Sequence, residues 1–177
     1  MKKIFKIVLI SSLLLGTCAK TFSQNQGDNY NRKFKLGIGV STGLPFNDPY
    51  NFNLGGDLRL QYNLSETYSL TFTTGFNNLF VKDDNTDLSY IPIKIGYKSF
   101  IFKNEFYVMG EVGVAFSVTK EYDTNSLLFS PSVGYATKYV DISVRYEFLK
   151  DFPVIKDNAV DDGLGQVMLR LAYGFDL

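Results

Sequence analysis

The sequence has no histidine, no tryptophan and a single cysteine among its 177 residues. Histidine is the commonest general base and metal ligand, so its absence argues against most catalytic and metal-dependent mechanisms. One cysteine cannot form a disulfide within the chain. Because 18 lysines and arginines balance 18 aspartates and glutamates, no basic surface for nucleic acid is indicated. These shortages predict a protein that is not an enzyme, has no cofactor and does not bind nucleic acid.

What the sequence does contain begins with an export signal at residues 1–23. Lysines at three of the first six positions precede an apolar run from Ile7 to Leu15, and Thr21-Phe22-Ser23 supplies the small residues of a cleavage site. The run is far shorter than the roughly 20 residues that a membrane-spanning helix needs. We therefore expect cleavage after Ser23, an N-terminal segment at 24–33 and one folded domain at 34–177.

A rival processing site is centred on Cys18. The sequence Leu15-Gly16-Thr17-Cys18 is similar to a lipobox, in which the cysteine is acylated. Thr17 fits poorly, because such boxes carry glycine, alanine or serine at that position. Whether Cys18 is lipidated or removed with the signal peptide stays open at this point.

From Phe34 onward the apolar residues recur with a period of two, which indicates β-strands and not helices. Each segment has one apolar face and one face of polar residues and glycine. The expected strand segments are Phe34 to Ser41, Leu54 to Tyr62, Tyr68 to Phe76, Ile91 to Lys98, Phe106 to Phe116, Leu127 to Tyr135, Val140 to Glu147 and Val167 to Asp176. Eight is an even number, as in bacterial single-chain barrels. The pattern predicts an all-β fold, an eight-stranded antiparallel transmembrane up-and-down β-barrel.

The connections predict the orientation of this barrel. Three links are short, at Ser65 to Thr67, Ser99 to Asn104 and Ala136 to Lys138. The other four are longer and rich in Asp, Asn and Thr, among them Phe148 to Asp162. Since short turns face the periplasm in such barrels, the longer links should face outward.

Aromatic residues collect at both ends of the expected strands and predict two interfacial girdles. Tyr90 is assigned to the outer girdle. Pro92 and Pro131 fall inside strand segments, although proline lacks the N–H that a central strand needs. We expect each of them near a bulge or a strand end.

Alternation alone does not say which face lies inside, so a soluble barrel with an apolar interior is the competing interpretation. The polar face carries charges together with many small residues, which suits a narrow lumen. The apolar face is almost uncharged. The expected lumen charge network consists of Asp57, Arg59, Lys94, Glu111, Asp141, Arg145, Glu147 and Arg170, with Lys35, Lys98 and Asp176 on the same face. Counting from the strand ends predicts that Glu111 faces Arg59, Lys94, Arg145 and Arg170.

From Phe34 to its end the chain resembles the small outer-membrane β-barrel family of Gram-negative bacteria, the OmpA/OmpX-type eight-stranded class. The resemblance is carried by Leu88 to Gly96, Ser130 to Tyr135, Asp141 to Tyr146 and the ending Leu169 to Leu177. It implies that the alternating ending is read by the outer-membrane insertion machinery. The residues of this assembly signal are Leu169, Leu171, Tyr173, Phe175 and Leu177, with leucine where many members end in phenylalanine.

The function expected from these features is structural or surface-interacting, at the cell outer membrane, with the lumen plugged by its own charges. The expected partners are outer-membrane lipid, lipopolysaccharide and the insertion machinery, and the expected state is a monomer. Enzymes of this class use histidine, which the chain lacks. Two alternatives remain open, a narrow channel for small solutes and a soluble periplasmic lipocalin-like binding barrel.

Overall fold

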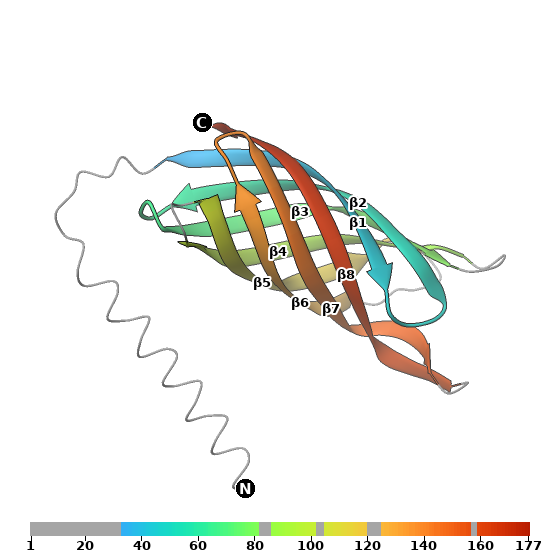
Figure 1. Cartoon of the computed structure of the whole chain (residues 1–177). Coiled ribbons are helices and arrows are strands. Elements are labelled where there is room, and N and C mark those ends of the chain that lie inside the picture. Colours follow the sequence, from blue (N-terminus) through green and yellow to red (C-terminus); the bar gives the residue numbers. More distant parts are fainter. Residues whose placement is uncertain (1–32, 82–85, 102–104, 120–124, 157–158) are drawn as a thin grey trace, which may run out of the picture. The chain divides into compact units, whose positions relative to one another are not determined.

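The computed structural model describes residues 33–81, 86–101, 105–119, 125–156 and 159–177 (Figure 1). The expected signal peptide at 1–23, including Cys18, and nearly all of the segment at 24–33 lie outside the described residues. Within those described ranges, no helix is long and apolar enough to cross a membrane.

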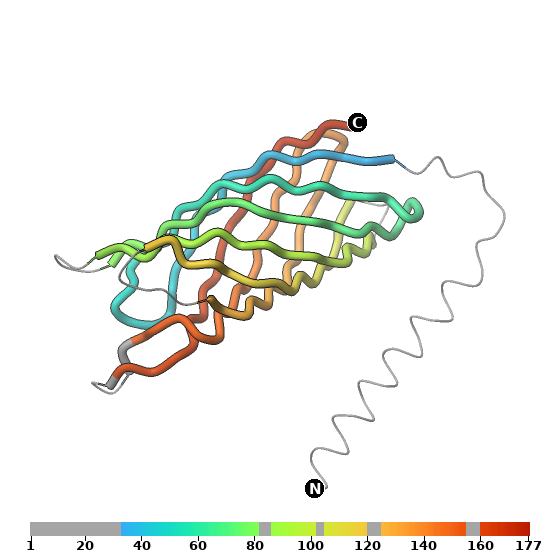
Figure 2. The backbone as a smooth tube through the Cα atoms, turned by 180° about the vertical axis from the view of Figure 1, so that it is seen from behind, coloured from blue at the N-terminus to red at the C-terminus, as the bar shows by residue number. Residues whose placement is uncertain are grey.

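Eight antiparallel strands close into a barrel in simple chain order, and they wind obliquely around it (Figure 2). The strands are β1 (Phe34–Pro45), β2 (Tyr50–Asn63), β3 (Tyr68–Val81), β4 (Leu88–Ile101), β5 (Phe106–Ser117), β6 (Asn125–Ala136), β7 (Val140–Lys156) and β8 (Ala159–Asp176). The predicted eight-stranded up-and-down barrel is therefore confirmed.

The barrel closes where its first strand meets its last. The register of β1 and β8 runs from Lys35 opposite Asp176 to Pro45 opposite Gln166. Beyond this ladder, the N–H of Leu177 donates to the carbonyl of Phe34 at 2.9 Å. Both edges of the sheet are paired, so closure removes the free edges that an open sheet would present.

The apolar face of the strands points outward. Leu58 keeps 48% of its surface exposed, whereas its neighbours Asp57 and Arg59 keep 7% and 3%. The same alternation runs along all the strands, because successive side chains of a strand point to opposite faces. The apolar face therefore forms a belt around the outside of the barrel, the reverse of a soluble barrel.

Aromatic pairs mark the end of the barrel that carries the β2–β3, β4–β5 and β6–β7 turns, called the short-turn end below. Three pairs join neighbouring strands, and the fourth joins Tyr139 of the β6–β7 turn to β8, with ring centroids 4.7 to 5.9 Å apart. The pairs are Phe34 with Tyr62, Tyr68 with Tyr97, Phe106 with Tyr135 and Tyr139 with Tyr173. Rings at this level are typical of the interface between a bilayer and water.

The assignment of Tyr90 to the outer girdle is wrong. Its side chain is fully buried in the barrel interior. Tyr90 shares its parity with Pro92 and Lys94, so the pleat that turns Lys94 inward also turns Tyr90 inward.

The longest expected loop, Phe148 to Asp162, is largely a hairpin. β7 continues to Lys156 and β8 begins at Ala159, with pairs from Pro153 opposite Asp162 to Lys156 opposite Ala159. A register shift lies between Leu149 and Pro153, and Gly163 across from it has a φ of +121°, which favours glycine. The end opposite the short turns, called the hairpin end below, therefore carries strands longer than a bilayer requires.

Both prolines lie inside strands, not at a bulge or a strand end as expected. The pairs of β3 with β4 stop at Thr74 opposite Ile93 and resume at Asn77 opposite Tyr90, which leaves Pro92 outside them. The pairs of β6 with β7 skip Pro131 in the same way. Each proline thus sits where the ladder on one side is interrupted, which accommodates its missing N–H.

Candidate functional site: the charged barrel interior

The inward faces of the strands bring the predicted charge network together. All eight of its members point into the barrel, and seven of them keep 7% or less of their surface exposed. The eighth, Asp141, lies nearer the short-turn end with 17% of its side chain exposed. Charges buried to this degree are tolerated only when they are paired and hydrogen-bonded.

Asp57 on β2 and Arg170 on β8 form the tightest ion pair. Nε of Arg170 lies 2.9 Å from each carboxylate oxygen of Asp57, and Nη2 donates to Oδ1 at 2.5 Å. Several N–H donors on one carboxylate give a stronger contact than a single charge-assisted bond. Nη1 of the same guanidinium lies 3.6 Å from Asp141.

Glu111 on β5 is fully buried and contacts two cations. Its carboxylate lies 3.5 Å from both Nη2 of Arg59 and Nζ of Lys94. The hydroxyl of Thr73 donates to it at 2.7 Å and accepts a 3.1 Å bond from Nε of Arg59. The expected contacts with Arg59 and Lys94 are therefore present, whereas Arg170 pairs with Asp57 instead.

Glu147 on β7 is the second buried carboxylate that several side chains contact. Nζ of Lys94 lies 3.1 Å from its carboxylate, so this lysine bridges Glu111 and Glu147. The Tyr90 hydroxyl donates to Glu147 at 2.7 Å, and Gln166 donates to both the hydroxyl and the carboxylate. Nε of Arg145, also expected beside Glu111, lies 3.9 Å from Glu147.

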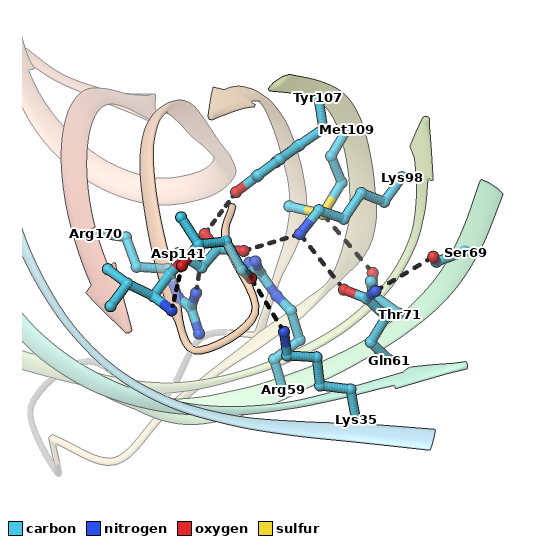
Figure 3. A network of polar contacts seen from close by, with 12 residues as sticks. Lys35, Arg59, Gln61, Ser69, Thr71, Lys98, Tyr107, Met109, Asp141 and Arg170 are labelled. Atoms are coloured by element: carbon cyan, nitrogen blue, oxygen red, sulfur yellow. Dashed lines mark hydrogen bonds and ion pairs between the residues drawn. The ribbon is translucent and has the colours of Figure 1, made fainter. Parts of the chain in front are cut away.

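A third group gathers around Asp141 towards the short-turn end (Figure 3). Nζ of Lys98 lies 2.8 Å from Asp141, and the hydroxyl of Tyr107 donates to the same carboxylate at 2.7 Å. The ammonium also lies 3.7 Å from the centroid of the Tyr107 ring, a cation–π contact. Lys35 reaches across this end and donates to the carbonyl of Thr137 at 3.3 Å.

An apolar cluster, which was not predicted from the sequence, fills the interior at the hairpin end. Phe152 is fully buried and packs edge-on against Tyr90, with centroids 5.4 Å apart. The cluster consists of Tyr50, Leu79, Leu88, Tyr90, Ala115, Leu128, Leu149, Phe152, Val154 and Leu164. Parity could have placed Leu128 inside, but Leu149, Phe152 and Val154 fell in a segment read as a loop.

The interior charges neutralise one another. Each of the four interior carboxylates forms an ion pair with a cation on another strand. In the residues that the structure describes, no three acidic or cysteine side chains gather as a metal site would require.

The expected assembly signal lies on the outer face of β8. Leu169, Leu171 and Tyr173 are half exposed there, Phe175 is partly exposed and Leu177 is exposed. These residues present one apolar stripe along the strand that closes the barrel.

No family model matches the chain, and no curated protein matches it. Solved structures do. The crystal structure of Ail, the attachment invasion locus protein of Yersinia pestis, is 16% identical, with a TM-score of 0.54, covering 81% of this chain and 99% of that one. The Yersinia pestis outer membrane protein Ail in a phospholipid bilayer nanodisc gives 16% identity, a TM-score of 0.53 and the same coverages.

A second protein of the same shape is the N-terminal β-barrel domain of Pseudomonas aeruginosa OprF, at 10% identity and a TM-score of 0.56, with 81% of this chain and 99% of that chain covered. Identities this low establish the fold alone. The resemblance seen in the sequence is confirmed at that level, and the chain has the fold of the small eight-stranded outer-membrane β-barrels.

Proposed function

We propose that this chain is a non-enzymatic, monomeric outer-membrane barrel with a structural or surface-interaction role, whose lumen is closed by its own side chains. It is exported by the signal peptide at 1–23 and inserted by the outer-membrane machinery that reads its last strand. Lipid and lipopolysaccharide surround its apolar belt.

The outward apolar face supports the membrane location. A lipocalin-like barrel keeps its apolar side chains inside, where a ligand contacts them, whereas this barrel exposes them along every strand. The aromatic pairs at the short-turn end add the rings expected at a bilayer surface.

The closed lumen is supported by two layers of side chains that fill the interior. Eight strands leave an interior that side chains can fill. Here the three charged groups occupy it towards the short-turn end, and the apolar cluster around Phe152 occupies the hairpin end. Ions crossing this interior would have to displace paired charges and then cross an apolar layer.

The absence of enzyme activity is supported by the same contacts. The chain has no histidine, and its interior carboxylates are held by cations. A buried carboxylate engaged in this way is not poised to exchange protons with a substrate.

A surface-interaction role is supported by the hairpin end. The β7–β8 hairpin projects there (Figure 1), with Val160 keeping 78% of its surface exposed beside the exposed Asp161 and Asp162. The similar Yersinia protein is named for attachment and invasion. An exposed apolar residue followed by two acidic residues is a surface that a partner outside the cell could contact.

The test combines localisation and conductance. The full chain, expressed with its signal peptide, should fractionate with the outer membrane and show heat-modifiable gel migration. In planar bilayers the purified barrel should show little or no conductance beside a general porin as the positive control. Steady porin-like conductance would reject the closed lumen and favour the narrow-channel alternative, and a periplasmic location would reject the membrane assignment.

A further inference from the structure

Among the interior cations that the structure describes, Arg145 has the loosest contact with a carboxylate. Its Nε lies 3.9 Å from Glu147, which Lys94 and Tyr90 contact at 3.1 and 2.7 Å. Its Nη2 donates to Oγ of Ser41 at 3.2 Å. Arg145 is only 2% exposed, and its Nε and Nη1 have no hydrogen-bond partner among the described residues.

The charge balance of the interior points to the same residue. In the described part of the barrel, the interior cations are Arg59, Lys94, Lys98, Arg145 and Arg170, and the interior carboxylates are Asp57, Glu111, Asp141 and Glu147. Lys35 and Asp176 balance each other in register at the short-turn end. One positive charge is left over, and Arg145 carries it because the other four cations have closer carboxylates.

A small donor lies on the strand next to Arg145. Ser132 on β6 is the register partner of Arg145, whereas Ser130, two residues away on the same inward face, is in register with Glu111 on β5. Both hydroxyls are buried without a hydrogen-bond partner among the described residues.

We propose that the barrel binds one small monovalent anion of halide size beside Arg145, held by Nε and Nη1 and by the hydroxyl of Ser132. Water would satisfy these donors without neutralising the guanidinium, and an uncompensated buried charge is costly. The inference rests on the proposed closed lumen, because bulk ions would screen Arg145 in an open, water-filled pore.

The test measures thermal unfolding of the refolded barrel in detergent, with sodium chloride replacing sodium gluconate at constant ionic strength. We expect a saturable rise in Tm of about 3 °C or more in chloride. Arg145→Met should lose this dependence. Lys98→Met, which removes the same charge elsewhere in the interior, should keep it. If Arg145→Met does not fold, Ser132→Ala supplies the second variant and should weaken the dependence.

Crystals grown in bromide should show an anomalous peak in contact with Nε or Nη1 of Arg145. A Tm that does not respond to chloride, an equal response in Arg145→Met, or bromide found only elsewhere would each overturn the inference. Conductance tells the two proposals apart. Porin-like current rejects the closed lumen itself, whereas a silent barrel without a halide response rejects the anion site alone.

Discussion

Arg170 on β8 and Asp57 on β2 pair through the interior across the inward face of β1, which lies between them in the sheet. Gly39 is the β1 residue beneath this contact. A Cβ added at Gly39 would lie 2.9 Å from Cζ of Arg170 and 3.0 Å from Cβ of Ala172. The ion pair therefore depends on a residue with no side chain in the strand that it crosses.

Gly39→Ala should destabilise the barrel because Arg170 cannot retreat without leaving Asp57. Overpacking of this kind costs typically about 1 to 3 kcal/mol. Gly37→Ala is the matched control, since its added Cβ would meet nothing closer than 3.7 Å. Urea unfolding in lipid vesicles measures both variants, and equal losses would contradict the predicted clash.

Glu111→Gln should destabilise the barrel more strongly, because Arg59 and Lys94 would keep their charges and lose a shared carboxylate. Removing one partner of a buried pair typically costs about 3 to 5 kcal/mol in a dry site. Adding Arg59→Gln should recover part of the loss. The same unfolding assay yields the coupling energy of the double-mutant cycle, and independent, additive losses would argue against a direct pair.

Leu58→Arg should cost about 2 to 4 kcal/mol, because this outward residue lies deep in the apolar belt. Leu70→Arg should cost only about 0 to 1 kcal/mol, as expected near an interface. Leu70 pairs in register with Tyr62 and Tyr97 of the aromatic girdle, and Leu58 lies four positions beyond Tyr62 along β2. Folding free energies in vesicles compare the two variants, and equal costs would show that Leu58 does not lie deeper in the membrane than Leu70.

Deletion of Tyr173 to Leu177 should prevent assembly, because β1 loses its pairs from Ile38 to Lys35. The truncated chain should collect in the periplasm without heat-modifiable migration. Phe175→Ala keeps the strand length and separates recognition from closure. It should slow insertion while the inserted protein stays heat-modifiable, and normal insertion of the truncated chain would refute the assembly signal.

The period of two was sufficient to predict most of the strands and which residues share a face, because side-chain direction depends only on local pleating. The prediction that the polar face lies inside came from its charges and small residues. The prediction for Tyr90 was wrong although the same alternation applies to it, since Tyr90 and Lys94 are four positions apart and lie on the same face. Pairing partners were harder to predict. The contact of Arg170 with Asp57, and not Glu111, depends on the stagger of eight tilted strands and on side-chain reach, neither of which a single segment encodes.

The hairpin end was predicted least well. Residues 148–162 contain proline, aspartates and asparagine, which favour turns, and their alternation is broken by the register shift after Leu149. Beyond that shift the described residues of β7 and β8 pair only with each other, outside the part of the barrel in which every strand has two neighbours. The apolar cluster could not be recognised for the same reason, since it required Phe152 and Leu164 to be placed on facing strands.

Closure of the barrel by β1 and β8 also sets the order in which the chain can become stable. Every other strand pair joins neighbours in sequence and forms by closing a short loop, whereas Lys35 meets Asp176 only after nearly the whole chain has been ordered. Long-range pairing of this kind is slow because its entropy is lost before its contacts are gained. Until β8 arrives, β1 is the unpaired edge of a sheet with an apolar face, so the chain is most prone to aggregate just before its last strand is in place.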